Sequence, residues 1–427
     1  MSHTYMDSQG RPVVVVTGMG LMTSLGAGVA DNWRRLTAGD SGIHRITRFA
    51  LDHMKTTIAG TVDFLAVDPM CAPELSERMA EVVVAEAVAE AGIGGVGDFP
   101  GPLFLALPPV ELEWPQRRVL AAASGANEAV GYDDLFKAAS GGGFTALHER
   151  FLFGSVAENL SVRFGTKGSP VAISTACASG ATAIQLAVEA IRRGETDAAL
   201  CIGTDASVNP ESLIRFSLLS ALSTRNDEPE KASRPFSKDR DGFVMSEGAA
   251  ALVLESLAAA TARGARILGV LEGCGERADS FHRTRSNPDG RPIIACLRNA
   301  LDDAGIEPEQ IDYINAHGTS TPENDKMEWL GVSTVFGPRA GSIPISSNKS
   351  MIGHTLTAAG TVEAVVSLLT LRHQRIPPTI NYAVPDPALP VDCVPNVARD
   401  ARMTRAISNS FGFGGQNLCL VLKVAPG

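Results

Sequence analysis

The sequence of 427 residues lacks an excess of positive charge. Its 47 aspartates and glutamates outnumber its 37 lysines and arginines, so the formal net charge is -10 at pH 7. Proteins that bind nucleic acid or an anionic membrane surface rely on a basic footprint, which this composition does not provide. We therefore expect no nucleic acid among the partners of this chain.

Long apolar runs and paired cysteines are missing as well. The sequence has no stretch of about 18 uncharged apolar residues, and residues 1–12 lack the basic and apolar regions of a secretory signal. The 7 cysteines are scattered and never spaced C-x-x-C, which argues against a disulfide framework and against a structural zinc site. These absences predict a cytoplasmic protein without membrane insertion.

Apolar residues make up 44% of the chain and form strand-like runs separated by helical patterns. Helices are predicted over 31–38 and 178–193. The predicted strands are 13–17, 171–174, 198–203, 249–254, 266–271, 311–315, 343–346 and 418–424. Buried strands that alternate with helices are typical of an α/β fold. The stretch 92–168, rich in small residues, gives no assignable pattern.

One pattern occurs twice. The strand at 173–174 precedes a helical pattern that contains Gly180, and the strand at 345–346 precedes one that contains Gly360. Similarity at a fixed spacing indicates an internal duplication. We therefore expect two similar halves that join near residue 260. Their predicted ranges are 1–260 and 261–427.

The first segment with chemical potential is 171–180, which is predicted to run from a strand into a helix. It places Cys177 at a helix N-terminus, where the helix dipole and unpaired amides favour the nucleophilic thiolate. The small neighbours Ala176, Ala178 and Gly180 would leave room for a substrate. A buried structural cysteine is an equal alternative from this segment alone, because cysteine is among the most buried residue types.

Two further strand ends carry histidines. His317 follows the strand at 311–315, and His354 lies at the mouth of a helix after Lys349. A helix N-terminus disfavours imidazolium, so His354 is expected to stay neutral. One cysteine and two histidines at strand ends match the requirements of covalent catalysis. The same three residues lack a fourth ligand and short ligand spacing, so no metal is expected.

The last such segment is 406–417, in which glycines flank Phe411 and Phe413. A loop of this kind brings backbone amides close to a substrate or lets an aromatic ring swing, and the alternative is a tight turn before the final strand. The glycines at 17–23 are not a dinucleotide-binding motif, because Thr23 replaces the third glycine.

Together these segments resemble the β-ketoacyl-[acyl-carrier-protein] synthases, the elongating condensing enzymes of the thiolase superfamily. The resemblance is carried by 14–20, 174–180, 221–227, 234–236, 239–244, 315–322, 346–354 and 408–415. It implies the thiolase fold, with five α/β/α/β/α layers built from two similar halves, and a homodimer. It also implies that acyl-carrier protein is the partner and delivers substrates on its phosphopantetheine arm, with no metal or redox cofactor.

The resemblance assigns roles to the catalytic candidates. Cys177 would accept the acyl group, with its own amide and that of Phe411 as the oxyanion hole. His317 and His354 would bind the malonyl thioester carbonyl and stabilise the enolate that forms as carbon dioxide leaves. Lys349 would tune the histidines rather than attack.

Other residues would serve the substrate. Thr319 and Thr321 resemble the residues that hydrogen-bond the phosphopantetheine arm, Phe413 resembles an aromatic gate, and Phe216 resembles a residue that lines the acyl pocket. Two carboxylates fall on positions that the resemblance marks as supporting or structural, Asp325 and Glu363.

The expected function is that of an acyltransferase, a 3-oxoacyl-ACP synthase that elongates fatty acids by decarboxylative Claisen condensation. A polyketide-type ketosynthase shares the same catalytic residues, and a non-catalytic chain-length-factor-like partner would lack the cysteine. Ser220 stands where the family often has a basic residue for the carrier, and 100–168 departs from the family pattern. These departures suggest a specialised paralogue for long or very long acyl chains.

Overall fold

The computed structural model describes residues 5–94, 97–125 and 130–425. Ten strands follow one another in the order β11-β10-β14-β15-β9-β1-β8-β7-β5-β6. The first five are β11 (Ile345–Ser346), β10 (Tyr313–Asn315), β14 (Arg405–Phe411), β15 (Gln416–Val424) and β9 (Gly269–Ala278). The other five are β1 (Val14–Thr23), β8 (Gly248–Ser256), β7 (Ala198–Asp205), β5 (Leu103–Ala106) and β6 (Val171–Ile173). Every strand predicted from the sequence overlaps one of these ten.

The two sets of five strands repeat one pairing pattern. From the point where β1 meets β9, each set continues with two antiparallel pairs and then two parallel pairs. The short strands outside this pattern are β2 (Gly26–Ala27), β3 (His44–Arg45), β4 (Ile58–Ala59), β12 (Arg375–Ile376) and β13 (Arg399–Asp400). Residue 260, the predicted boundary between the halves, lies in α9 (Leu257–Ala262) between β8 and β9, and the division at this residue stays a prediction.

Helices lie between and outside the two sets of strands. Helices α7 (Ser179–Arg192) and α13 (Ala359–His373) pack in the middle, where α7 contacts β5 and β7 and α13 contacts β14 and β15. The outer face of one set carries α2 (Ala72–Ala91) and α6 (Ser155–Phe164), and that of the other carries α10 (Arg291–Ala304) with α11 (Pro322–Phe336). The predicted five-layer α/β fold is confirmed.

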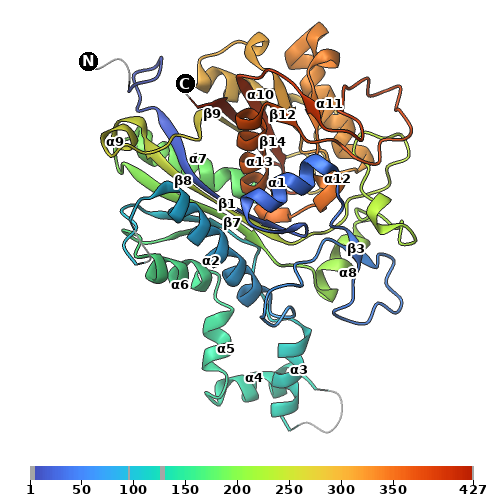
Figure 1. The fold of residues 1–427 in the computed structure, drawn as a ribbon. Helices are drawn as coiled ribbons and strands as arrows, with labels where there is room; N and C mark the ends of the chain where they lie inside the picture. Colours follow the sequence, from blue (N-terminus) through green and yellow to red (C-terminus); the bar gives the residue numbers. More distant parts are fainter. Residues whose placement is uncertain (1–4, 95–96, 126–129, 426–427) are drawn as a thin grey trace.

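The remaining helices are short and lie around these layers. They are α1 (Val29–Ala38), α3 (Trp114–Ala123), α4 (Tyr132–Ser140), α5 (Thr145–Arg150), α8 (Pro210–Leu218) and α12 (Lys349–Ile352), with 3-10 turns at Pro229–Lys231, Pro308–Gln310, Gly337–Ser342 and Leu356–Ala358. Helices α3, α4 and α5 come from the stretch 92–168 and extend away from the layered body (Figure 1). No helix in the described ranges is long and apolar enough to cross a bilayer.

The two central helices touch at their first turns. A Cβ on Gly180 of α7 would lie 2.5 Å from the backbone nitrogen of Thr361 in α13, and a Cβ on Gly360 would overlap the backbone nitrogen of Ala181. Only glycine permits such an approach between two backbones. The residues that first suggested a duplication therefore form the contact between the two halves.

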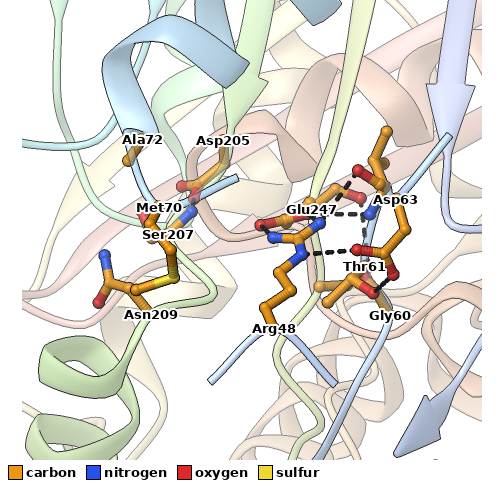
Figure 2. Close-up of polar contacts among 12 residues, drawn as sticks. Arg48, Gly60, Thr61, Asp63, Met70, Ala72, Asp205, Ser207, Asn209 and Glu247 are labelled. Carbon is orange, nitrogen blue, oxygen red and sulfur yellow. Dashed lines mark hydrogen bonds and ion pairs between the residues drawn. The ribbon is translucent and has the colours of Figure 1, made fainter. Parts of the chain in front are cut away.

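A buried ion pair secures the segment between β3 and β4. The guanidinium of Arg48 donates two hydrogen bonds of 2.6 Å to Glu247 and one of 2.6 Å to Asp63, as Figure 2 shows. The Arg48 side chain is 3% exposed and that of Glu247 is 0% exposed. Next to Glu247, the amide of Ser246 donates to the carbonyl of His354 at 2.9 Å. This ion pair thus supports the segment before β8 whose backbone is hydrogen-bonded to a candidate catalytic histidine.

Arg48→Met should lower the free energy of unfolding by about 3–5 kcal/mol, because it leaves Glu247 as a buried charge without its partner. Urea titration followed by circular dichroism measures this change. The control is Arg34→Met, whose ion pair with Asp31 is 68% exposed on the arginine side and should contribute less than about 1 kcal/mol. Equal stability losses in both variants would contradict the role given to Arg48.

Candidate active site

Cys177 lies in the turn between β6 and α7. Ala176 before it has a φ of 50°, a left-handed conformation that costs an alanine about 1 kcal/mol or more. Ala178 is buried, and the space beside Gly180 is occupied by the backbone of α13. The small residues around Cys177 therefore serve the turn and the helix contact, and the prediction that they make room for a substrate is wrong for Ala178 and Gly180.

His354 is the nearest catalytic candidate to the thiol. Its Nε2 lies 3.1 Å from Sγ of Cys177. The backbone amide of Leu356 donates to Nδ1 at 3.3 Å, so the proton of the neutral ring resides on Nε2. His354 therefore presents an N–H donor to the sulfur, and to any substrate oxygen that takes the same position.

His317 presents the same kind of donor by a different route. Lys349 is 1% exposed, and its ammonium lies 3.4 Å from Nδ1 of His317 and donates to the His317 carbonyl at 2.7 Å. Because an ammonium has no lone pair to offer, Nδ1 is the acceptor and the ring proton resides on Nε2. Lys349 also pairs with the buried Glu363. The His317 and His354 rings are 5.3 Å apart at their centroids.

Burial determines the charge states of this site. It lowers the pKa of both His317 and His354 well below the usual value, and the charge of Lys349 acts in the same direction. The predicted neutral state of His354 is confirmed, with burial as its main cause. Burial also raises the pKa of Cys177 to about 11, although a Phe413 amide and Lys349 oppose it. From the sequence, the helix N-terminus is expected to favour the thiolate, but desolvation has the larger effect on this thiol.

The glycine-flanked loop reaches the same sulfur. The backbone amide of Phe413 acts on Cys177 and lowers the pKa of its thiol, while Phe411 ends β14 with its ring centroid 5.9 Å from that of His317. Of the two aromatic residues, Phe413 is thus the one whose amide is directed at the nucleophile. A Cβ on Gly412 would lie 3.3 Å from the backbone nitrogen of Cys177. The loop therefore passes close to the Cys177 amide, which is a second backbone donor.

Two cavities meet at Cys177. The outer one, about 380 Å³, is lined by Thr319 and Thr321, whose hydroxyls are 2.9 Å apart. The inner one, about 530 Å³, extends between α2 and α8. Phe216 and Phe413 line both, with ring centroids 6.5 Å apart. The structure therefore places all of the predicted site residues around one nucleophile, with aromatic rings where the cavities join.

Sequence reasoning missed two buried carboxylates that hold the histidine loops. Glu328 of α11 accepts from the amides of His317 and Gly318 at 2.8 and 2.7 Å. Asp205, at the end of β7, accepts from the amide and hydroxyl of Thr357 at 3.0 and 2.6 Å. The only available signal in the sequence concerned Glu328, which is an acidic residue in the helix that follows His317. The predicted supporting carboxylate Asp325 accepts from the Phe236 amide at 2.9 Å.

The distances between these side chains also allow a metal ion. The ligand atoms of Cys177, His317 and His354 all lie within 4.8 Å of one another. The electrostatics oppose a cation, however, because the ammonium of Lys349 is 3.4 Å from His317 Nδ1. A divalent ion would also require the thiolate, which burial disfavours here.

Comparisons with known proteins agree with this geometry. The model of the β-ketoacyl synthase N-terminal domain matches residues 11–95 and 109–260, and that of the C-terminal domain matches 268–383. The 3-oxoacyl-[acyl-carrier-protein] synthase 2 of Coxiella burnetii is 40% identical over 96% of this chain and 98% of its own length. The tetracenomycin polyketide synthase ketoacyl synthase alpha subunit of Streptomyces glaucescens is 35% identical, with 96% of each chain covered.

Solved structures give the same result. The type II polyketide ketosynthase of the AntDE:AntF complex, determined with its acyl-carrier protein, has a TM-score of 0.88 and 32% identity and covers 97% of this chain and 100% of its own. A β-ketoacyl synthase from Burkholderia phymatum has a TM-score of 0.82 and 32% identity, with the same coverage. The chain belongs to the β-ketoacyl synthase family.

The protonation of Cys177 predicts how its reactivity depends on pH. With a pKa of about 11, the thiolate fraction and the rate of alkylation by iodoacetamide should rise about tenfold per pH unit between about pH 7 and pH 9. Peptide mass spectrometry measures modification of Cys177 separately from the other cysteines. A rate that is already constant above about pH 8 would contradict a thiol held neutral by burial.

Proposed function

We propose that this protein is a 3-oxoacyl-ACP synthase that elongates an acyl group held on Cys177 by decarboxylative Claisen condensation with malonyl-ACP. The observation that carries the proposal is the juxtaposition of one thiol and two neutral imidazoles, with 3.1 Å between Cys177 Sγ and His354 Nε2. Each imidazole has its proton on Nε2 and so acts as a hydrogen-bond donor. The family membership and the full-length relatives support the same reaction.

The first half-reaction transfers the acyl group. The Cys177 sulfur attacks the thioester carbonyl of acyl-ACP, a new carbon–sulfur bond forms, and the carrier leaves as its thiol with the proton that Cys177 gives up. The amides of Cys177 and Phe413 would stabilise the oxyanion of the tetrahedral intermediate. This assigns the second donor to Phe413, where the sequence resemblance had suggested Phe411, because the Phe413 amide already reaches the sulfur.

The second half-reaction forms the carbon–carbon bond. The malonyl carboxylate leaves as carbon dioxide, and its electron pair forms an enolate whose oxygen accepts hydrogen bonds from His317 and His354. The enolate carbon attacks the acyl carbonyl on Cys177, and the sulfur leaves as a thiolate that takes up a proton from solvent to restore the thiol. Both imidazoles act here as neutral donors, because burial disfavours imidazolium at both positions. Lys349 positions His317 and keeps its acceptor nitrogen directed inward.

Partners follow from this chemistry. Thr319 and Thr321 line the outer cavity, where the phosphopantetheine arm of acyl-carrier protein would enter. The reaction needs no metal or redox cofactor, since the imidazoles and amides supply the required donors. A homodimer in the cytoplasm, as in the expectation from sequence, belongs to the same proposal. A non-catalytic partner role is disfavoured by the fully formed environment of Cys177.

A polyketide-type ketosynthase is the second candidate, because the AntDE:AntF ketosynthase has a TM-score of 0.88 with this chain. The two candidates share the reaction and differ in the acyl chain. Specialisation for long or very long chains would depend on the inner cavity, whose far end includes Glu111 and Leu112 just before α3. From the sequence, 100–168 is expected to depart from the family pattern, but the family model matches the chain again from residue 109, so this expectation is wrong for Glu111 and Leu112.

Intact-protein mass spectrometry tests the reaction. Incubation with acyl-ACP should add one acyl group to the wild type and none to Cys177→Ala. Replacing either histidine by alanine should reduce condensation by about 100-fold to 1,000-fold, the usual cost of one lost oxyanion donor, and should reduce loading much less. An unmodified Cys177 across several chain lengths would count against the function. Equal losses of loading and condensation would count against the division of labour.

A further inference from the structure

Two carboxylates line the inner cavity together with the proposed nucleophile. Glu113 is 3% exposed, and Glu211 at the start of α8 has both carboxylate oxygens buried. Both residues line the cavity that also contains Cys177. An acyl chain attached to Cys177 and extending into this cavity would therefore meet these carboxylates within a lining that is otherwise mostly apolar.

Glu113 is anchored through one oxygen only. Its Oε1 accepts from the amide of Ala72 at 3.0 Å and from Nδ2 of Asn209 at 3.2 Å. These donors come from the start of α2 and from the residue before α8 (Figure 2). Oε2 of Glu113 is buried without a partner. Leaving a buried acceptor unsatisfied costs about 1–3 kcal/mol, so this oxygen is suited to a donor that arrives with a ligand.

Two described donors that line the cavity already have other partners. Asn209 accepts from the Ser212 amide at 2.9 Å through its Oδ1, and its Nδ2 already donates to Oε1 of Glu113. Arg215 also lines the cavity but pairs with Glu111. Burial and the neighbouring charge of Glu211 raise the pKa of Glu113 to about 7, which agrees with a carboxyl that lacks compensation.

We propose that the inner cavity selects acyl chains that carry a hydrogen-bond donor, a hydroxyl or an ammonium group, toward their distal end, with Glu113 as the specificity-determining residue. The inference rests on the proposed function, because it assumes that the chain is attached to Cys177. Oε2 of Glu113 would accept the donor from either group. An ammonium would in addition contact Glu211, whose two oxygens are both without a partner.

The experiment compares matched acyl-ACP substrates over several chain lengths: unsubstituted, terminally hydroxylated, terminally aminated and terminally oxidised to a ketone. The kcat/KM of condensation is measured for each with the full-length protein. At the best chain length, the hydroxylated or aminated substrate should exceed the unsubstituted one by about tenfold or more, the range of one hydrogen bond to a carboxylate. Glu211→Gln separates the two donors. It should reduce the preference for the aminated substrate and leave the preference for the hydroxylated substrate unchanged.

Glu113→Gln provides the sharpest variant. Ala72 and Asn209 both donate to this position, so they should hold the amide oxygen of the new side chain and direct its NH2 group into the cavity. The preference should then shift from donor-bearing substrates to the ketone. Glu113→Met should favour the unsubstituted chain. Glu149→Gln, which changes an exposed carboxylate on α5, is the matched control and should leave all preferences unchanged.

The outcomes distinguish the two proposals. If unsubstituted chains load on Cys177 and condense, but the wild type favours them or the ketone over donor-bearing chains, the inference about Glu113 is wrong while the proposed function stands. The same holds if Glu113→Gln and Glu113→Met leave the preferences unchanged. If no acyl group of any kind reaches Cys177, the proposed function fails and the inference fails with it.

Discussion

The contact between the first turns of α7 and α13 is the constraint on which the site depends. Gly180 and Gly360 let the two backbones approach more closely than any side chain would allow. Cys177 lies just before one of these helices and His354 shortly before the other. The helix contact therefore brings together a nucleophile and a donor that are 177 residues apart in sequence. The thiol of Cys177 precedes α7, whereas His317 follows β10 and His354 precedes α13.

Burial then decides what these groups can do. It keeps the thiol protonated and both imidazoles neutral, so the resting site contains donors rather than charges. Lys349 is the exception, and its buried ion pair with Glu363 compensates the charge of its ammonium group. Such an arrangement favours a reaction that generates negative charge on a thioester oxygen, because preorganised donors are strongest where water is excluded. Burial also makes the unpaired oxygens of Glu113 and Glu211 costly unless a ligand satisfies them.

Much of this architecture could be predicted from the sequence. Strand-end positions identified Cys177, His317 and His354, and the repeated glycines indicated two halves, because local patterns specify strands and helices. Protonation of Cys177 could not be predicted, since it depends on burial by distant segments. Strand β5 and helices α3 to α5 lie in a stretch without clear periodicity, and the carboxylates Glu113 and Asp205 accept hydrogen bonds from partners remote in the sequence. The use of Gly180 for a helix contact also depends on tertiary structure.

A crystal structure of the acyl-enzyme tests the central claim most directly. After reaction with an acyl-ACP substrate, the account predicts a thioester on Cys177 whose carbonyl oxygen accepts hydrogen bonds from the amides of Cys177 and Phe413. The acyl chain should extend past Phe216 toward Glu113, and both imidazole Nε2 atoms should remain free for the malonyl thioester. An acyl group on another residue, or a carbonyl oxygen bound by His317 and His354 in place of the two amides, would contradict the account.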